Sequence, residues 1–453
     1  MTTKASESET ARGVTIVRGT VCHVTADPFS QADDLNALET YEDGGLAFDE
    51  SGRILSLTDF SEARRRYPQA GLIDRSGCLI LPGLIDCHIH FPQTLLIGAF
   101  GEELLDWLRR HTFPEEIKYR ERHYAEQAAR IFFQEEIANG TTTALIFGAH
   151  FEEATGVAFA EAERRGFRAF MGMTLSDCNL PAELALPAED AYRACKRLIE
   201  RWHGKGRLKY VVTPRFALTC SPELLRVCRA LTEEHPDVYF QTHLNENHHE
   251  IERIKEIFSD ADSYLSVYDS FGLLGPRSFF EHCIYSKDKE IDRLAQSHSR
   301  VTHCPSSNMF LGSGLIPLKK YVDRQVIVAL GSDVAGGTSF SLLKEMGHAY
   351  KVQALQMFAM ERPDLAVMLT PVKLLYLATL AGARALGMEG QIGNFSCGAS
   401  ADLVVVDPGL DAYFQARLKN VGSTAEKLFL LAVLGDKHLV REVLIGGRTA
   451  HSR

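Results

Sequence analysis

Short apolar runs rich in β-branched and aromatic residues recur along the middle of this chain, and amphipathic stretches separate them. From these runs we predict eight strands, at residues 84–90, 142–148, 167–174, 208–216, 238–244, 278–285, 300–305 and 326–333. The stretches between and after them have helical spacing, as at 153–165, 188–202, 221–234, 248–258 and 339–386. An alternation of strand and helix repeated eight times predicts a parallel (β/α)8 barrel, the TIM-barrel fold of the α/β class.

Both ends of the chain have a different pattern, with alternating strands and few helical stretches. Residues 14–80 contain several such strands, and further strands are expected at 401–407 and 441–450. We predict that the two ends pair into one small β-sandwich domain. The expected division is therefore a sandwich built from residues 1–80 and 389–453, and a barrel of residues 81–388.

Composition limits the kinds of partner that the chain can have. Hydrophobic residues make up 45% and charged residues 24% of the sequence, which is typical of a globular enzyme, and the net charge is −10. Without a block of lysine or arginine, this charge argues against nucleic acid or an anionic membrane as a partner. The polar N-terminus does not resemble a signal peptide, and the longest apolar run, 428–434, is too short to span a bilayer. Ten cysteines without a C-x-x-C pair favour a cytoplasmic location.

Histidine and aspartate residues stand at the ends of four predicted strands. His88 and His90 form an H-x-H pair, whose side chains point to the same face of a strand. His243 ends the fifth predicted strand, His282 the sixth and Asp333 the eighth. Because a (β/α)8 barrel brings the C-terminal ends of its strands together, these distant residues predict a metal site.

The ligand types favour zinc, although Fe2+ takes the same ligands. His88, His90, His243 and Asp333 would leave one position for a water molecule, whose pKa the metal lowers towards about 7. Glu246, close after His243, would move a proton between that water and a substrate. The fourth strand ends in TPRFAL without the lysine that bridges two metals in related barrels, so we expect one metal per chain.

Three further residues could bind a flat, carbonyl-bearing ring. Arg215 offers a fork of donors, Phe216 a stacking face and Gln93 an amide edge. On spacing alone, Arg215 could equally be a salt-bridge partner and Phe216 part of the core. We assign the adjacent His303 and Cys304 to a turn, since consecutive strand residues face opposite ways. A candidate lid over the pocket spans residues 94–115.

Taken together, these motifs resemble the amidohydrolase superfamily over nearly the whole chain. The resemblance rests on PGLIDCHIHFPQT (82–94), TPRFALTCS (213–221), THLNEN (242–247), EHC (281–283), THCPSSN (302–308) and GSDVAGG (331–337). It implies a homodimeric zinc aminohydrolase with one metal per chain, and guanine as the expected small-molecule substrate. The implied metal ligands are His88, His90, His243 and Asp333; the implied catalytic residues are Glu246, His282 and Asp333; and the implied substrate contacts are Gln93, Arg215, Phe216 and His282.

Two alternatives stay open at this point. The chain could be an aminohydrolase of the same barrel that acts on another purine, a pterin or a triazine ring. It could also be a non-enzymatic scaffold of the same fold. Such scaffolds lose their metal ligands, whereas every expected ligand is present in this sequence.

Overall fold

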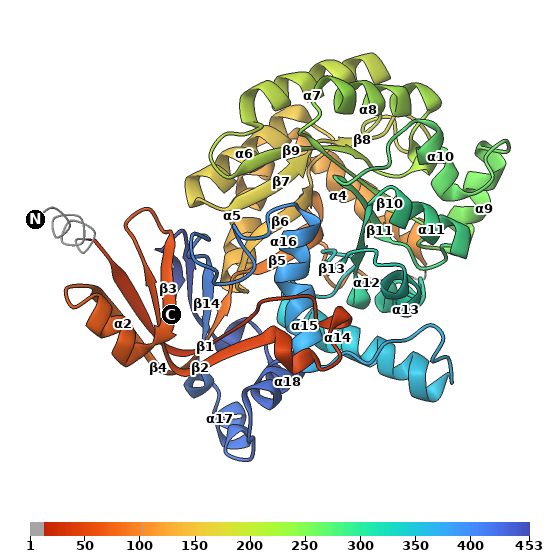
Figure 1. Cartoon of the computed structure of the whole chain (residues 1–453). Coiled ribbons are helices and arrows are strands. Elements are labelled where there is room, and N and C mark those ends of the chain that lie inside the picture. Colours follow the sequence, from red (N-terminus) through yellow and green to blue (C-terminus); the bar gives the residue numbers. More distant parts are fainter. Residues whose placement is uncertain (1–12, 102) are drawn as a thin grey trace, which may run out of the picture. The chain divides into compact units, whose positions relative to one another are not determined.

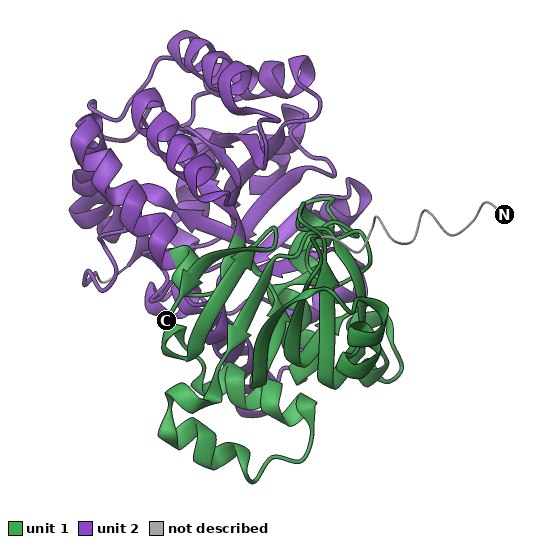
Figure 2. Cartoon of the chain, turned by 90° about the vertical axis from the view of Figure 1, so that its left-hand side faces the viewer, with its two compact units in different colours: residues 1–85, 136–142, 369–453 green, residues 86–135, 143–368 purple. Residues whose placement is uncertain are grey.

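The computed structural model describes residues 13–101 and 103–453. The chain divides into two compact units, coloured separately in Figure 2. One unit comprises Met1–Ile85, Glu136–Thr142 and Leu369–Arg453, and the other Asp86–Glu135 and Thr143–Met368. Residues 81–85, 136–142 and 369–388, which the expected boundaries assign to the barrel, group with the first unit.

A parallel sheet of barrel strands forms the core that carries the strand-end residues (Figure 1). Its strands, in chain order, are β5 (Leu84–His90), β6 (Thr141–Phe147), β7 (Arg168–Gly172), β9 (Leu208–Pro214), β10 (Tyr239–Leu244), β11 (Ser278–His282), β12 (Arg300–His303) and β13 (Val328–Leu330). The short strand β8 (Thr174–Leu175) pairs with β9 beside this path. Each of the eight predicted strands is therefore found, and the predicted barrel is confirmed.

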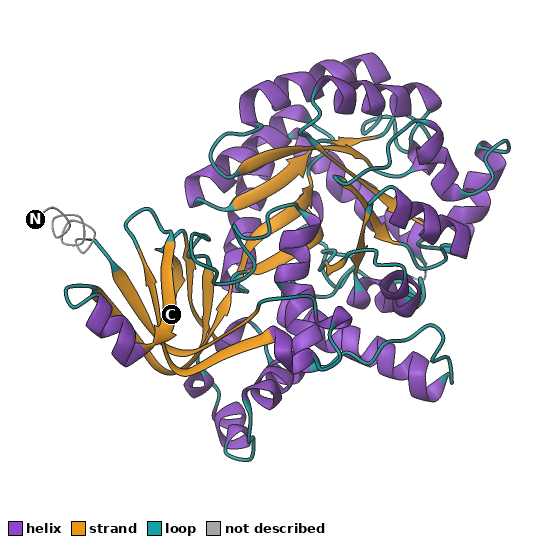
Figure 3. Cartoon of the chain, viewed as in Figure 1, coloured by secondary structure: helices purple, strands orange, loops and turns teal. Residues whose placement is uncertain are grey.

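Helices alternate with the barrel strands, as Figure 3 shows. They are α3 (Leu104–Trp107), α4 (Phe113–Ile117), α5 (Arg122–Ala138), α6 (Glu152–Arg165), α7 (Ala188–Trp202), α8 (Pro222–Glu234), α9 (His248–Ile257), α10 (Tyr264–Ser270), α11 (Asp288–Gln296), α12 (Pro305–Phe310), α13 (Leu318–Asp323) and α14 (Leu342–Ala354). The Ser221 hydroxyl accepts a hydrogen bond from the Leu224 N–H at 3.2 Å, which caps α8.

The helical region predicted at 339–386, with a second helix start at Thr370–Pro371, is divided into separate helices, and that second start is found. After α14 and a π-helical turn, η7 (Leu355–Ala359), the helix stops, and it resumes at α15 (Pro371–Ala378) and α16 (Leu380–Ala385). The intervening segment contains Pro363, which cannot continue a helix.

Strands from both ends of the chain pair in one seven-stranded sheet, as predicted. Its order is β16 (Arg448–Ser452), β15 (Val440–Ile445), β14 (Leu403–Val406), β4 (Gly71–Pro82), β1 (Thr15–Val24), β2 (Leu38–Phe48) and β3 (Ile54–Asp59). The link between the two ends is the antiparallel pairing of β14 with β4. The helices α2 (Phe60–Arg66), α17 (Ala412–Leu418) and α18 (Thr424–Leu434) belong to the same unit. Among the described residues, none of the helices is long and apolar enough to cross a membrane.

The first and last barrel strands are joined at their C-terminal ends by hydrogen bonds through Asp86. Its buried carboxylate oxygen Oδ1 accepts from the backbone N–H of Ser332 at 3.0 Å and of His88 at 3.1 Å. In turn, the Asp333 N–H donates to the His88 carbonyl at 2.8 Å. Gly331 permits this approach, because a Cβ atom there would lie 2.7 Å from the Cβ of His88. The positions of His88 and Asp333 are thus set by the same backbone contacts.

Replacing Asp86 with alanine should destabilise the barrel, because two buried N–H groups lose their acceptor. We expect the free energy of unfolding, measured by urea denaturation, to fall by about 2–5 kcal/mol. Asp86→Asn is the matched control, since it keeps one acceptor oxygen of the same reach and should cost less than half as much. Equal losses in the two variants would contradict the role of these hydrogen bonds.

Candidate metal centre and substrate pocket

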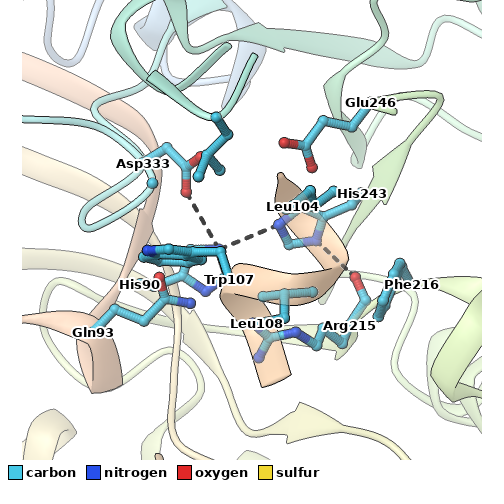
Figure 4. Close-up of a pocket in the computed structure, with 12 residues that line it drawn as sticks. His90, Gln93, Leu104, Trp107, Leu108, Arg215, Phe216, His243, Glu246 and Asp333 are labelled. Carbon is cyan, nitrogen blue, oxygen red and sulfur yellow. Dashed lines mark hydrogen bonds and ion pairs between the residues drawn. The ribbon is translucent and has the colours of Figure 1, made fainter. Parts of the chain in front are cut away.

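The strand-end histidines and Asp333 converge on one point in the barrel unit. His90 Nε2 lies 3.2 Å from His243 Nε2, and Asp333 Oδ1 lies 3.2 Å from His88 Nε2 and 3.5 Å from His90 Nε2. His282 Nε2 is 3.8 Å from Asp333 Oδ2. Figure 4 shows the side chains of His90, His243 and Asp333 pointing toward one another. The five side chains that the sequence placed at strand ends therefore form one cluster.

The hydrogen-bonding state of the cluster fits a bound cation. The His243 Nδ1–H donates to the Arg215 carbonyl at 2.7 Å, so the lone pair of His243 lies on Nε2, facing the cluster. Nε2 of His88 and Nε2 of His282 are buried without a hydrogen-bond partner among the described residues. Burial lowers the pKa values of His88, His90 and His243, which keeps their rings neutral. Buried lone pairs that converge in this way are unfavourable unless a metal ion takes them up.

Two overlapping groups of donor atoms have the spacing of metal ligands. In each group the donor atoms lie within 4.8 Å of one another: one group is His88, His243 and His282, and the other is His88, Cys304 and Asp333. Cys304 lies in a turn after β12, as predicted, and its thiol is also within reach of the cluster, which the sequence did not predict. No pattern in the sequence indicated this, because Cys304 follows β12 and its backbone no longer alternates as a strand does.

Glu246 is buried beside the cluster of histidine and aspartate side chains and is held from two sides. Its Oε2 lies 3.5 Å from His282 Nε2, and the Ser313 hydroxyl donates to its Oε1 at 3.0 Å. The backbone N–H of Glu246 donates to Glu250 Oε2 at 3.1 Å, and Tyr264 donates its hydroxyl proton to Glu250 Oε1 at 2.7 Å. Burial raises the pKa of Glu246, so its carboxyl group can hold a proton closer to neutral pH.

His282 is fixed by a side chain that lies beyond the cluster. Its Nδ1–H donates to Asn308 Oδ1 at 2.8 Å, which leaves Nε2 directed at Glu246 and Asp333. The backbone of His282 is left-handed, with φ of 64°, as are those of Asn245 at 51° and Asp333 at 49°. These conformations turn the chain sharply where each strand ends.

A pocket opens next to the cluster and contains the three predicted ring-binding residues. The lining residues are His90, Gln93, Leu104, Trp107, Leu108, Arg215, Phe216, His243, Glu246, Leu311, Asp333 and Gly336. Asp333 and Glu246 lie at the top of the view in Figure 4, and Gln93 and Arg215 lie below. The apolar wall comes from α3 and the π-helical turn η4 (Leu108–Thr112), which belong to the candidate lid 94–115. Residue 102 of that segment is outside the described residues.

Arg215 is both a pocket residue and a salt-bridge partner, so the two explanations offered by the sequence are not exclusive. Its Nη1 donates to both carboxylate oxygens of Glu116, each at 2.8 Å. Gln93 Nε2 donates to Glu116 Oε1 at 3.3 Å, and His150 Nε2 lies 3.0 Å from Glu116 Oε2. Burial opposes ionisation of Glu116, but the nearby Arg215 and His150 lower its pKa to about 2.

Several residues around the site were not singled out from the sequence. They share a supporting position, since each contacts a residue that faces the cluster or the pocket: Glu116, Glu250, Glu281, Asn308 and Ser313. Only Glu250 had a readable signal, because Asn247 and Glu250 form the N-x-x-E pattern of a helix-capping box at the start of α9. The fourth barrel strand, β9, ends at Pro214 without a lysine, as expected.

Comparison with known proteins identifies the class to which this barrel and site belong. The model of the Amidohydrolase family matches residues 79–449, and the chain belongs to that family. A Deinococcus radiodurans protein named probable guanine deaminase is 44% identical over 442 residues, which are 97% of this chain and 99% of that protein. The solved structure of Escherichia coli guanine deaminase has a TM-score of 0.93 at 39% identity and covers 97% of this chain and 100% of its own. Guanine deaminase from C. acetobutylicum, solved with guanine bound in the active site, has a TM-score of 0.87 at 26% identity, covering 96% and 100%.

The buried carboxyl group of Glu250 should make stability depend on pH. Burial and the charge of Glu246 raise its folded-state pKa to about 7, whereas an unfolded glutamate titrates near about 4.3. Between these values the folded state keeps a proton that the unfolded state has lost, so stability falls as pH rises. We expect Glu250→Gln to remove this contribution, so that the free energy of unfolding of the unsubstituted protein, relative to the variant, falls by about 2 kcal/mol from pH 5 to pH 7. Urea denaturation at both pH values measures it.

Glu252→Gln, which changes an exposed carboxylate on the same helix, is the matched control. It should leave the pH dependence as it is in the unsubstituted protein. A Glu250→Gln variant with an unchanged pH dependence would contradict the raised pKa.

Proposed function

We propose that this chain hydrolyses guanine to xanthine and ammonia, with one zinc ion per chain. The observation that carries the proposal is the convergence of His88, His90, His243 and Asp333 beside a pocket that also holds Glu246 and Arg215. Relatives that share nearly the full length of the chain and are named guanine deaminases support the choice of substrate.

Zinc would be held by His88, His90, His243 and Asp333, whose donor atoms are buried and convergent. When bound, it supplies a water molecule of lowered pKa as the nucleophile for attack on C2, the carbon that bears the amino group of guanine. Three imidazoles and one carboxylate suit zinc, but Fe2+ takes the same ligand types. The choice of zinc over Fe2+ therefore rests on the family resemblance.

Glu246 would move the protons of the reaction. Its raised pKa suits a carboxyl group that takes a proton from the attacking water and gives it to the ring nitrogen next to C2. A further proton transfer to the amino group lets ammonia leave, and the ring becomes that of xanthine. Ser313 and Glu250 hold Glu246 in place for both steps.

His282 and Asp333 would stabilise the tetrahedral intermediate that forms when water adds to C2. Asn308 occupies Nδ1 of His282 and leaves Nε2 on the side of Glu246 and Asp333. A donor or acceptor that is already oriented costs no rearrangement during the reaction.

The pocket side chains would select the ring. The N–H groups of Arg215 that do not bind Glu116 would donate to the ring carbonyl oxygen, which adenine lacks. Gln93 would bind a ring edge and Phe216 would contact the flat face of the ring. His282 is not among the residues that line the pocket; it would lie near the amino group from its place beside Glu246.

We also propose how the chain assembles and where it is located. We infer a homodimer from the family resemblance alone, and light scattering of the purified protein tests it. We infer a cytoplasmic location because all ten cysteines are free, which suits a reducing compartment.

Purified protein should release ammonia from guanine and contain about one zinc per chain by elemental analysis. A substrate panel with 8-oxoguanine, adenosine and a melamine-like triazine separates this function from that of another aminohydrolase of the same barrel. Preference for another ring in the panel would transfer the proposal to that ring. Metal-free protein without activity on any of them would favour the scaffold alternative.

Glu246→Gln should keep its metal and lose most of its turnover, because the amide cannot carry the proton that the carboxylate carries. We expect kcat to fall by at least about 100-fold, in line with the usual contribution of a general acid or base. Metal content measured on the same sample separates loss of proton transfer from loss of the site. Near-normal activity would reject the assignment.

A further inference from the structure

The polar wall of the pocket is held by one buried carboxylate that the proposed reaction does not use. We propose that Glu116 is a positioning residue, which fixes the hydrogen-bond donors of Gln93 and Arg215 and thereby makes the pocket select a ring that carries a carbonyl oxygen. The proposal rests on the proposed function for the identity of the ring. It concerns the arrangement of this chain's own side chains.

Glu116 connects three separate strand ends from a position behind the pocket. It lies on α4 with 1% of its surface exposed, and it does not line the pocket itself. Its partners follow β5, β6 and β9: Gln93 at 3.3 Å, His150 at 3.0 Å and Arg215 at 2.8 Å to each oxygen. Two of these partners line the pocket, so a change at Glu116 reaches the substrate only through them.

Glu116 determines which way the Gln93 amide faces. An ionised carboxylate only accepts hydrogen bonds, so the amide group next to it must be the NH2 of Gln93. At the other end, the Ala335 N–H donates to Gln93 Oε1 at 3.2 Å, which requires the oxygen there. With both ends specified, Gln93 has one remaining Nε2 hydrogen to offer a ligand.

Glu116 also determines which donors of Arg215 remain. Both carboxylate oxygens accept from Nη1, so this nitrogen is taken up and the Nε and Nη2 hydrogens are left for a ligand. The wall therefore presents donors from both residues, a pattern that matches an acceptor such as a carbonyl oxygen.

The negative charge of Glu116 has a second effect, since it balances the buried guanidinium of Arg215 near the cluster of histidine and aspartate side chains. Arg215 acts electrostatically on Glu246 and on the three predicted histidine ligands as well. Without Glu116, the carboxylate of Glu246 would be a competing partner for Arg215. Glu116 thus keeps the positive charge directed at the ring-binding end of the pocket.

If Glu116 only formed a structural salt bridge, its loss would affect all substrates alike. Discrimination between substrates therefore distinguishes a structural role from a positioning role. Guanine and 2-aminopurine carry the same amino group, but 2-aminopurine lacks the carbonyl oxygen. With Glu116→Gln we expect kcat/KM for guanine to fall at least about 30-fold and kcat/KM for 2-aminopurine to fall less than about fivefold, since only the first substrate uses the donors. A structural role would lower both equally.

Two controls make this comparison specific. Glu115→Gln changes the neighbouring buried carboxylate, which accepts from Lys118 and Tyr124 and does not line the pocket, and it should leave the guanine preference unchanged. In an Arg215→Ala background, adding Glu116→Gln should cost less than about threefold further for guanine, because Glu116 acts largely through Arg215. Additive losses in the double variant would overturn the proposal.

Binding without turnover separates this proposal from the proposed function. Hypoxanthine has the carbonyl oxygen but no amino group to remove, and purine has neither. Calorimetric titration of the metal-loaded protein should show hypoxanthine binding at least about tenfold more tightly than purine, and Glu116→Gln should abolish most of that ratio while metal content stays the same.

If guanine yields no ammonia but the variant loses the binding ratio, the proposed function fails and the role of Glu116 stands. A variant that keeps both the binding ratio and the guanine preference would overturn the proposal, as would an unsubstituted protein that binds the two ligands equally.

Discussion

The arrangement of the side chains at the candidate metal site depends on the contact between the first and last barrel strands. The backbone N–H of Asp333 donates to the carbonyl of His88. The carboxylate of Asp86 accepts from the backbone N–H of His88 in the first strand and of Ser332 after the last strand. Two side chains 245 positions apart in the sequence (88 and 333) are thereby placed 3.2 Å from each other. His90 shares the first strand with His88, and His243 comes from β10, which lies between these two strands along the sheet, so the contact between β5 and the end of β13 helps to bring the predicted metal ligands together.

The inner face of the site is built from groups that burial alone would disfavour. Imidazole rings converge there, and Nε2 of His88 and Nε2 of His282 are buried without a hydrogen-bond partner among the described residues, an arrangement for which a bound cation would compensate. Around them lies a second set of buried carboxyl groups with separate roles. Asp86 joins strands, Glu250 holds the loop of Glu246, and Glu116 holds the donors of the pocket. The side chains that face the cluster and the pocket are therefore held by buried carboxyl groups that lie behind them.

The sequence predicted the elements whose signal is local. The eight barrel strands, their histidine and aspartate ends and the pairing of the two terminal segments follow from alternation and spacing, and the structure has all of them. Supporting residues such as Glu116 and Ser313 could not be found this way, because their partners lie 99 and 67 positions away and no local pattern connects them. The turn at Cys304 was predicted, but the reach of its thiol to the cluster was not, since alternation within a strand says nothing about the residue that follows it. The end of the helix after α14 was not predicted, because helical spacing alone does not mark it, whereas the start of α15 could be read from Thr370 and Pro371.

The left-handed backbone at three strand ends has a consequence for how this site can change during evolution. Asn245, His282 and Asp333 adopt positive φ values, a conformation that asparagine, aspartate and histidine tolerate better than other residues with a side chain. The backbone therefore favours a few residue types at these positions, namely asparagine, aspartate and histidine. These are the residue types found there. Drift to a β-branched residue would remove a functional group and strain the turn at the same time. Selection for folding alone would thus slow the loss of these side chains, even in a descendant that no longer needed their chemistry.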